Sequence, residues 1–391
     1  MSNDTLMPGA GRAVRSPLRR LGFPPNAGTT WSTFARRFSF ARQGGSPSRR
    51  LNLALQGGGA HGAFTWGVLD ALLARGGLGF DGVSGTSAGA VNAVALAAGL
   101  MDGGADAARE CLHDIWSAIS RAGAPTSHPG SPLAYSATAK LSGALMQRSL
   151  ERIGGGWSPY DVNPLNLNPL RDILLARIDF EKLQRESPVH LFIAATEVAS
   201  GRGRVFRTHE ISANSVVASA CLPNLFPAVR IGRFYYWDGA FSANPDLLTL
   251  ISETTSDDTL LVQISPDRDP DLPSNREEIS GNIGRLTFNH PLRTQVQQIE
   301  VCRRVPRIPL LTDNAVSRMG RHRFHLIDGS PHTLKLARDT KHRPDWHMIE
   351  GLRDVGRQTT IEWCETHLAR VGKRSTADLY GKYFSDRVPF D

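Results

Sequence analysis

The chain has 391 residues, 40% of them hydrophobic, so it is long enough to bury a large core. Its formal net charge of +8 comes from the first 50 residues, which hold nine arginines, no lysine and one acid, while the remainder carries 36 basic and 36 acidic groups. That balance gives no reason to expect a nucleic-acid partner. The four cysteines have no paired spacing and predict free thiols in a reducing compartment, and no metal-binding motif stands out: Cys111, Cys221, Cys302 and Cys364.

Residues 1–50 are rich in Ser, Pro, Gly and Arg and contain no apolar stretch long enough for a signal peptide or a membrane span, which predicts a disordered basic tail. Trp31, Phe34 and Phe38 recur at helical spacing beside arginines, as in a short basic helix that lies on anionic lipid. The Arg- and Ser-rich start also resembles an organelle transit peptide. We expect a cytoplasmic protein that becomes peripheral to a membrane where the tail contacts lipid.

A glycine-rich turn, Gly57–Gly62 (GGGAHG), follows the apolar run at residues 51–56 and precedes a helical pattern at residues 63–75. It fits the G-x-G-x-x-G spacing of a dinucleotide site, in which bare backbone N–H groups at a helix N-terminus bind phosphate. The same bare amides can stabilise the oxyanion of an acyl-transfer intermediate. By itself the turn allows either a nucleotide-binding module or an oxyanion hole.

A second tight turn, Gly85–Gly89 (GTSAG), places Ser87 between a short buried strand at residues 81–84 and an Ala-rich helix at residues 88–101. Small flanking residues let a strand and a helix approach each other around a strained serine, which is the form of a nucleophile elbow. The positive end of the helix dipole favours an anion there. Residues 82–101 carry no charge, but their Gly, Ser, Thr and Asn content favours a buried helix over a membrane span.

The spacing of the two turns favours the oxyanion hole. Gly59 and Ser87 are 28 positions apart, which fits one helix, a turn and a short strand in a right-handed β-α-β unit. Both turns would then lie at the carboxyl edge of adjacent parallel strands, with the amides of Gly58 and Gly59 facing Ser87. A dinucleotide site would need an acid at the end of the second strand, whereas the nearby Asp81 lies at the beginning of that strand.

Apolar patterns along the rest of the chain predict a three-layer α/β/α domain with a mainly parallel central sheet, extending over residues 51–391. Mostly apolar strands are typical of a sheet that is covered on both faces. The strands expected after the two turns are at residues 189–196, 234–237, 259–265 and 323–327. The expected helices are at residues 105–121, 212–221, 279–304 and 345–371.

Residues 122–170 are the least regular part of this region. Gly, Pro and Ser stretches flank a short helical pattern near residues 137–153, and residues 163–169 have the composition of consecutive turns. An irregular excursion on the edge that carries Ser87 predicts either an acyl-binding lid or an insertion with no role in binding.

An aromatic strand, Phe234–Trp237, ends at Asp238 and Gly239. On local pattern alone, an Asp-Gly pair after a strand is more typical of a turn than of a catalytic site. A carboxylate is also a weak base at its reference pKa of about 3.9, so Asp238 would need burial to act as one. The adjacent Trp237 indicates apolar surroundings.

Three motifs occur in the order in which they are found in the patatin-like phospholipases, which are lipid acyl hydrolases with a Ser-Asp dyad. They are Gly57–Gly62, Gly85–Gly89 and Asp238-Gly239-Ala240. A fourth block, ASACLPNLFPAV at residues 218–229, is similar to the family's segment just before its Asp-Gly motif. The resemblance covers about residues 51–252 by motifs.

The resemblance implies that Ser87 is the nucleophile, that Asp238 is its proton acceptor, and that Gly58 and Gly59 are the oxyanion donors. It also implies a lipid acyl ester as substrate and no metal or organic cofactor. His61 stands where the family usually has Lys or Arg, so it would be a pH-dependent substitute for that charge. The motif-flanking glycines would shape the turns: Gly57, Gly62, Gly85, Gly89 and Gly239.

Other functions remain open from the residues alone. An α/β-hydrolase with a Ser-His-Asp triad would take a late histidine, namely His325, His332 or His342, although 28 residues between the glycine turns is short for that fold. A nucleotide-binding module would use Gly57–Gly62. A catalytically silent lipid-binding protein would keep the motifs without turnover.

Overall fold

The computed structural model describes most of the chain beyond residue 48. The described residues are 49–123, 158–306, 314–334, 336, 340–341 and 344–385. The expected tail up to residue 48, the short helix expected near residues 137–153, and His342 lie outside them. Arg49 and Arg50, which we assigned to the tail from the sequence, instead open the first strand.

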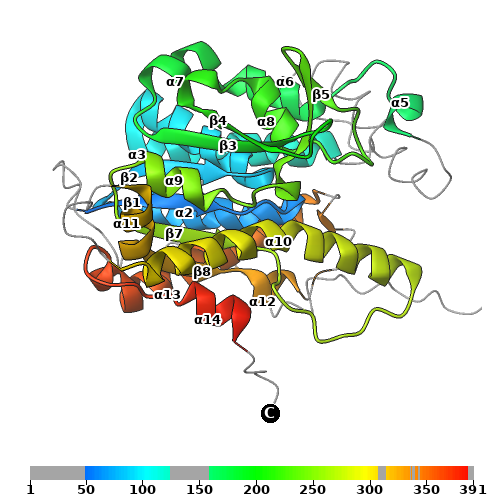
Figure 1. The fold of residues 1–391 in the computed structure, drawn as a ribbon. Helices are drawn as coiled ribbons and strands as arrows, with labels where there is room; N and C mark the ends of the chain where they lie inside the picture. Colours follow the sequence, from blue (N-terminus) through cyan, green and yellow to red (C-terminus); the bar gives the residue numbers. More distant parts are fainter. Residues whose placement is uncertain are drawn as a thin grey trace, which may run out of the picture.

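An eight-stranded sheet has the order β5-β6-β3-β2-β1-β7-β8, with β4 paired to β3 (Figure 1). Its strands are β1 (Arg49–Leu55), β2 (Leu78–Gly85), β3 (His190–Glu197), β4 (Gly203–Arg207), β5 (Val229–Ile231), β6 (Phe234–Asp238), β7 (Asp258–Gln263) and β8 (Arg323–Asp328). Neighbours from β3 to β8 along this order are parallel, whereas β4, β5 and β6 pair in antiparallel fashion. The sheet is therefore mainly parallel, as predicted.

Helices cover both faces of the sheet, which confirms the predicted three-layer α/β/α fold (Figure 1). They are α2 (Ala63–Arg75), α3 (Ala88–Gly123), α5 (Pro159–Val162), α6 (Pro169–Arg177), α7 (Phe180–Glu186), α8 (Ala213–Ser219), α9 (Leu247–Glu253), α10 (Arg276–Arg304), α11 (Ala315–Arg321), α12 (Ser330–Thr333), α13 (Trp346–His367) and α14 (Leu379–Phe384). Short 3-10 turns include η2 (Gly59–Gly62) and η5 (Gly239–Phe241).

Side chains of the central strands alternate between two buried cores. Leu53 and Leu55 of β1 belong to the core beneath α2, α3 and α13, whereas Ala54 between them belongs to the core beneath α9, α10 and α14. In β7, Leu260 and Leu261 divide in the same way. Because both faces of the sheet are covered, apolar side chains are favoured at successive positions, as at residues 53–55 of β1 and residues 260–262 of β7.

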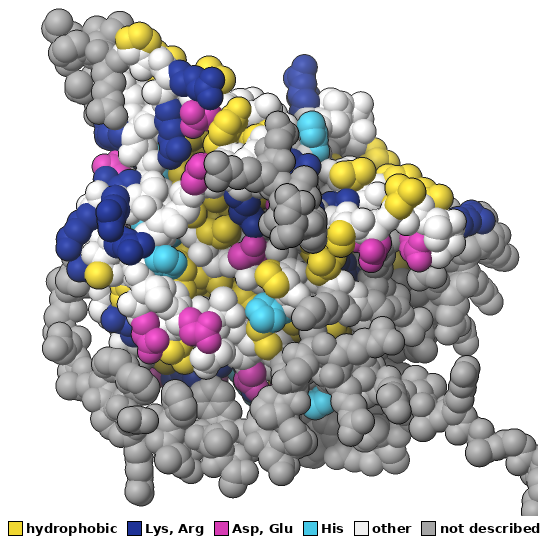
Figure 2. All heavy atoms as spheres, turned by 90° about the horizontal axis from the view of Figure 1, so that it is seen from below, with side chains coloured by type: hydrophobic (Ala, Val, Ile, Leu, Met, Phe, Trp, Pro, Cys, Tyr) yellow, Lys and Arg dark blue, Asp and Glu magenta, His cyan; other side chains and the backbone are white. Residues whose placement is uncertain are grey.

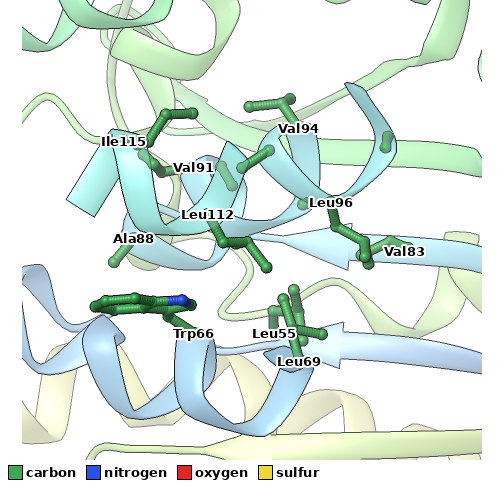
Figure 3. Packing of buried hydrophobic residues seen from close by; sticks show 14 of the residues in the cluster. Leu55, Trp66, Leu69, Val83, Ala88, Val91, Val94, Leu96, Leu112 and Ile115 are labelled. Atoms are coloured by element: carbon green, nitrogen blue, oxygen red, sulfur yellow. The ribbon is translucent and has the colours of Figure 1, made fainter. Parts of the chain in front are cut away.

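Helix α3 combines the two helices that the sequence predicts on either side of residue 103. Gly103 and Gly104 have non-helical backbone angles and mark the kink between them. Among the described helices, α3 is long and apolar enough to cross a membrane, but 67% of its most apolar stretch is buried. Figure 3 shows Ala88 and Leu112 of α3 pointing toward Trp66 and Leu69 of α2, in the same buried cluster, which fits the interpretation as a core helix.

Several predicted elements needed correction. Strands β4 and β5 were not expected, because short strands lack enough residues to show a period. Strand β2 begins at Leu78, so Asp81 lies inside it and not at its beginning. The buried Asp81 carboxylate accepts hydrogen bonds from the N–H groups of Thr255 and Ser256. The last expected helix ends at His367, and the shorter α14 follows it.

Acidic and basic side chains are interspersed over the described surface seen in Figure 2. Ion pairs of the described residues include Arg207 with Glu253 at 2.6 Å and Arg177 with Asp114 at 2.7 Å. This mixed surface agrees with the balanced charge of the chain beyond residue 50.

Helices α2 and α13 cross at two glycines. A Cβ atom at Gly67 would lie 1.9 Å from the Arg353 carbonyl oxygen, and one at Gly356 would lie 2.2 Å from the Phe64 carbonyl oxygen. The two backbones are therefore in direct contact, and the crossing has no room for a side chain.

We expect Gly356→Ala to lower the free energy of unfolding by about 1–3 kcal/mol, because the new methyl group must push the two helices apart. Urea denaturation would measure the loss. Gly284→Ala in α10 is the matched control: nothing lies within 4 Å of its would-be Cβ, so this variant should be neutral or more stable by up to about 1 kcal/mol. Equal midpoints for the two variants would contradict the tight crossing.

Candidate active site

Ser87 lies in the turn between β2 and α3, with its backbone in the left-handed region at φ 56°. A non-glycine residue in this region is strained, so the surrounding contacts must hold it there. Its N–H donates to the Ser219 hydroxyl at 2.9 Å, and its carbonyl accepts from Ala90 and Val91 as α3 begins. The side chain is 9% exposed, at the carboxyl edge of the sheet.

Asp238 reaches Ser87 through the antiparallel part of the sheet. It ends β6 and pairs with Ala195 of β3, and β3 in turn lies beside β2, with Ile193 opposite Gly85. The Ser87 hydroxyl hydrogen-bonds to the Asp238 carboxylate. The Asp238 carboxylate also accepts from the Ala240 N–H at 2.8 Å. The structure thus brings the predicted nucleophile and the predicted base into direct contact.

Burial raises the pKa of Asp238 to about 7, against the opposing effect of hydrogen bonds from the Ala240 N–H and the Ser87 hydroxyl. Only 2% of the residue is exposed. A carboxylate with a pKa near neutrality is a far better proton acceptor than one at its ordinary value. Burial likewise raises the pKa of the nearby Cys221 to about 12, and the negative charge of Asp238 contributes to that shift, so Cys221 remains a thiol.

The first glycine turn packs directly on Ser87. A Cβ at Gly57 would lie 2.8 Å from the Ser87 Cβ, so only glycine allows this approach. The Gly57 N–H donates to the Asn244 side-chain oxygen at 2.7 Å. The next two amides, of Gly58 and Gly59, make no hydrogen bond within the described part of the chain. They are therefore available to an anionic ligand.

A buried amide network anchors this turn from behind. The side-chain oxygen of Gln56 accepts from the N–H groups of Ile264 and Ser265, both at 2.8 Å, just after β7. Its amide nitrogen donates to Asn289 of α10 at 3.2 Å. The residue that precedes the glycines is thus held by the segment after β7 and by α10.

His61 is 1% exposed and hydrogen-bonds through Nε2 to the Thr340 hydroxyl at 2.8 Å. The neighbouring Lys341 carbonyl packs against Gly59, which has φ 59°. His61 therefore lies in the interior, where it contacts the segment around residue 340. Its suggested role as a substitute positive charge remains a prediction.

The other motif glycines stand where neighbouring atoms leave no room for a side chain. A Cβ atom would lie within 2.1–2.5 Å of another residue at each of four positions: Gly62, Gly85, Gly89 and Gly239. They allow the three motifs to pack against one another and against the strand ends.

The two late histidines within the described residues have other partners than Ser87. His325 is in β8, which β1 and β7 separate from β2, and its ring contacts Asp258 at 3.0 Å and Thr376 at 2.9 Å. His332 in α12 stacks on Phe64. Neither histidine is the group that the Ser87 hydroxyl contacts.

Two residues at the site were not predicted, Ser219 and Asn244. Ser219 lies in the block ASACLPNLFPAV that the sequence singled out, and Asn244 lies four residues after the Asp238-Gly239-Ala240 motif. A serine or asparagine near a turn has no distinctive local pattern, so only the folded contacts reveal their partners. Among the described residues, no group of three or more His, Cys, Asp and Glu side chains gathers in a way that could hold a metal ion.

The model of the patatin-like phospholipase family matches residues 53–251, about half of the chain. The chain belongs to this family, which confirms the resemblance seen in the motifs. The family places it among the lipid acyl hydrolases.

Solved structures give more distant similarities. VipD from Legionella pneumophila is 14% identical, with 86% of this chain and 73% of that chain covered and a TM-score of 0.37. ExoU, in its complex with SpcU from the type III secretion system of Pseudomonas aeruginosa, is 15% identical, with 83% and 52% covered and a TM-score of 0.30. The chain thus spans about half of ExoU. No curated protein matches the chain.

The raised pKa of Asp238 makes stability depend on pH. Between its value of 3.8 in the unfolded chain and about 7 in the fold, the folded state holds a proton that the unfolded state has lost, so stability falls as pH rises through this window. Asp238→Asn has no such charge to bury. We expect its stability advantage over the wild type, from urea denaturation, to grow by roughly 2–3 kcal/mol between pH 5 and pH 8. Parallel pH profiles would contradict the buried carboxylate.

Proposed function

We propose that the chain hydrolyses carboxylic ester bonds of lipids through a Ser87–Asp238 dyad and an acyl-enzyme. The observation that carries this proposal is the hydrogen bond from the strained Ser87 to the buried Asp238 carboxylate. A hydroxyl needs a base within hydrogen-bond reach to become a nucleophile. The family supplies the coarser assignment of lipid acyl hydrolase.

In the acylation step, Asp238 takes the proton of the Ser87 hydroxyl as its oxygen attacks the ester carbonyl carbon. The tetrahedral intermediate collapses, the bond to the alcohol breaks, and Asp238 returns the proton to the leaving oxygen. Water then attacks the acyl-enzyme with Asp238 again as base, which releases the fatty acid and restores Ser87. These steps require neither a metal nor an organic cofactor.

The developing oxyanion is assigned to the amides of Gly58 and Gly59. Two other amides beside the nucleophile already have acceptors, because Gly57 donates to Asn244 and Ser87 donates to Ser219. Oxyanion donors must be ready for the charge when it develops, and removal of one typically costs about 3 kcal/mol of barrier. The amides of Gly58 and Gly59, which make no hydrogen bond within the described part of the chain, meet this requirement.

The partners and location expected from the sequence remain part of this proposal. The substrate is a lipid or another acyl ester, and contact with a membrane would be transient, through the basic tail of residues 1–50. A nucleotide at Gly57–Gly62 is disfavoured. A dinucleotide site needs an acid at the end of the second strand, whereas the nearby Asp81 accepts hydrogen bonds from the loop at residues 255–256.

A fluorophosphonate probe with peptide mapping, together with short-chain ester hydrolysis, tests the dyad. We expect the label on Ser87, its loss in Ser87→Ala, and a fall in kcat of about 10³-fold or more in both Ser87→Ala and Asp238→Asn. A folded wild-type protein with neither label nor turnover would overturn the hydrolase proposal.

Two matched variants sharpen this test. Asp246→Asn changes another buried aspartate, which caps α9 by accepting from the Thr249 N–H. An asparagine at this position still offers an acceptor, so the variant should retain most activity. His332→Ala removes a late histidine. If Asp238→Asn remained active and His332→Ala did not, Ser87 would still be the nucleophile, but His332 and not Asp238 would be its base.

We expect kcat/KM to depend on the ionised form of Asp238. Because the pKa is raised to about 7, the fraction of carboxylate grows as pH rises, so kcat/KM should fall about tenfold per pH unit below 7 and level off above it. Initial rates on a short-chain ester from pH 5 to pH 9 would show this limb. An acid limb centred near pH 4 would mean that Asp238 titrates as an exposed carboxylate.

A further inference from the structure

One short segment of the chain contacts all the parts of the site. Asp238 at its start binds the Ser87 hydroxyl. The Ala243 carbonyl accepts from the Thr86 hydroxyl at 2.8 Å, directly before the serine. Asn244 then accepts from the Gly57 N–H at 2.7 Å. The base and the start of the glycine turn are therefore connected through seven consecutive residues, 238–244.

The Asn244 side chain is fixed at both ends. It is 1% exposed, and while its oxygen accepts from Gly57, its amide nitrogen donates to the Phe288 carbonyl of α10 at 3.1 Å. Rotation of the amide would exchange donor and acceptor and lose both bonds. The next residue of α10, Asn289, contacts Gln56, which directly precedes Gly57. Two consecutive residues of α10 therefore support the start of the glycine turn, Phe288 through Asn244 and Asn289 through Gln56.

The glycine turn needs such outside support. Three successive glycines have no side chains that could restrict their backbone, so their peptide planes can turn easily. A hydrogen bond to the Gly57 N–H fixes the first peptide plane of the turn. The orientation of the Gly58 and Gly59 amides that follow is thereby restricted. Displacement of an oxyanion donor affects the transition state more than substrate binding, because the charge develops only during reaction.

We propose that Asn244 is a positioning residue that holds the oxyanion turn in register with Ser87 through the Gly57 N–H. Asn244 does not touch the reacting atoms and acts through the turn. This inference rests on the proposed hydrolase function for its kinetic effect, whereas its structural effect on the turn can be measured without activity.

The kinetic test compares Asn244→Ala, which removes the acceptor, with Asn244→Asp, which keeps an acceptor for Gly57 and loses the donor to Phe288. We expect kcat for a short-chain ester to fall about 100-fold or more in Asn244→Ala, with KM changed less than about threefold. The kcat of Asn244→Asp should be at least about tenfold higher than that of Asn244→Ala. The acid limb of the pH profile in Asn244→Ala should stay that of the wild type, because Asp238 is unchanged.

Asn163→Ala is the matched control. Asn163 is also a buried asparagine. Its side-chain oxygen accepts from the Leu167 N–H, and its amide nitrogen donates to the Leu167 carbonyl, both at 2.9 Å. Asn163→Ala should lower the thermal midpoint of unfolding about as much as Asn244→Ala does, and its kcat should stay within about twofold of the wild type. A kcat for Asn244→Ala near that of the wild type, or the same fall in both variants, would overturn the proposal.

Hydrogen exchange tests the same inference without turnover. Mass spectrometry of a peptide covering residues 55–63 should show faster amide exchange in Asn244→Ala than in the wild type or in Asn163→Ala. Unchanged exchange in this peptide would overturn the positioning role even if activity fell. If the wild type had no esterase activity, the proposed function would fail, and the exchange result would still decide whether Asn244 holds the turn.

Discussion

The buried contact between the Ser87 hydroxyl and the Asp238 carboxylate sets the conditions that the rest of the site must meet. A carboxylate that is 2% exposed has lost most of its hydration, and the few hydrogen bonds that it receives do not offset that loss, so its pKa rises to about 7. The energy of packing elsewhere in the fold has to sustain this group and the strained serine beside it. Two large cores, one on each face of the sheet, provide that packing.

The sheet brings Ser87 and Asp238 together from strands that run in opposite directions. Parallel pairing of β1 and β2 brings Leu55 level with Gly85, so the glycine turn and the serine turn leave the same edge side by side. The aspartate arrives from β6, which runs antiparallel to β3 and ends at the same edge. The antiparallel strands at one side of a parallel sheet are thus the feature that places Asp238 beside Ser87.

Hydrogen bonds from residues outside the three motifs complete the site. Ser219 binds the Ser87 N–H, Asn244 binds the Gly57 N–H, and Gln56 joins the end of β1 to α10. These contacts occupy amides that would otherwise compete for an anion, and they leave Gly58 and Gly59 as donors in the described part of the glycine turn. Support of this kind gives a site its precision, because flexible glycines cannot hold a geometry alone.

The sequence by itself determined the local features: the helix at residues 63–75, the serine turn after a buried strand, the glycine turn 28 positions before it, and the three-layer arrangement. These follow from periodicity and turn chemistry, which act over a few neighbouring residues. The short strands β4 and β5 escaped prediction because they depend on pairing with β3 and β6. Only the tertiary structure decided that Asp238 meets Ser87, that His325 does not, and that Asn244 accepts from the Gly57 N–H. Desolvation and hydrogen bonds between residues more than a hundred positions apart depend on how the whole chain packs, and no local pattern records them.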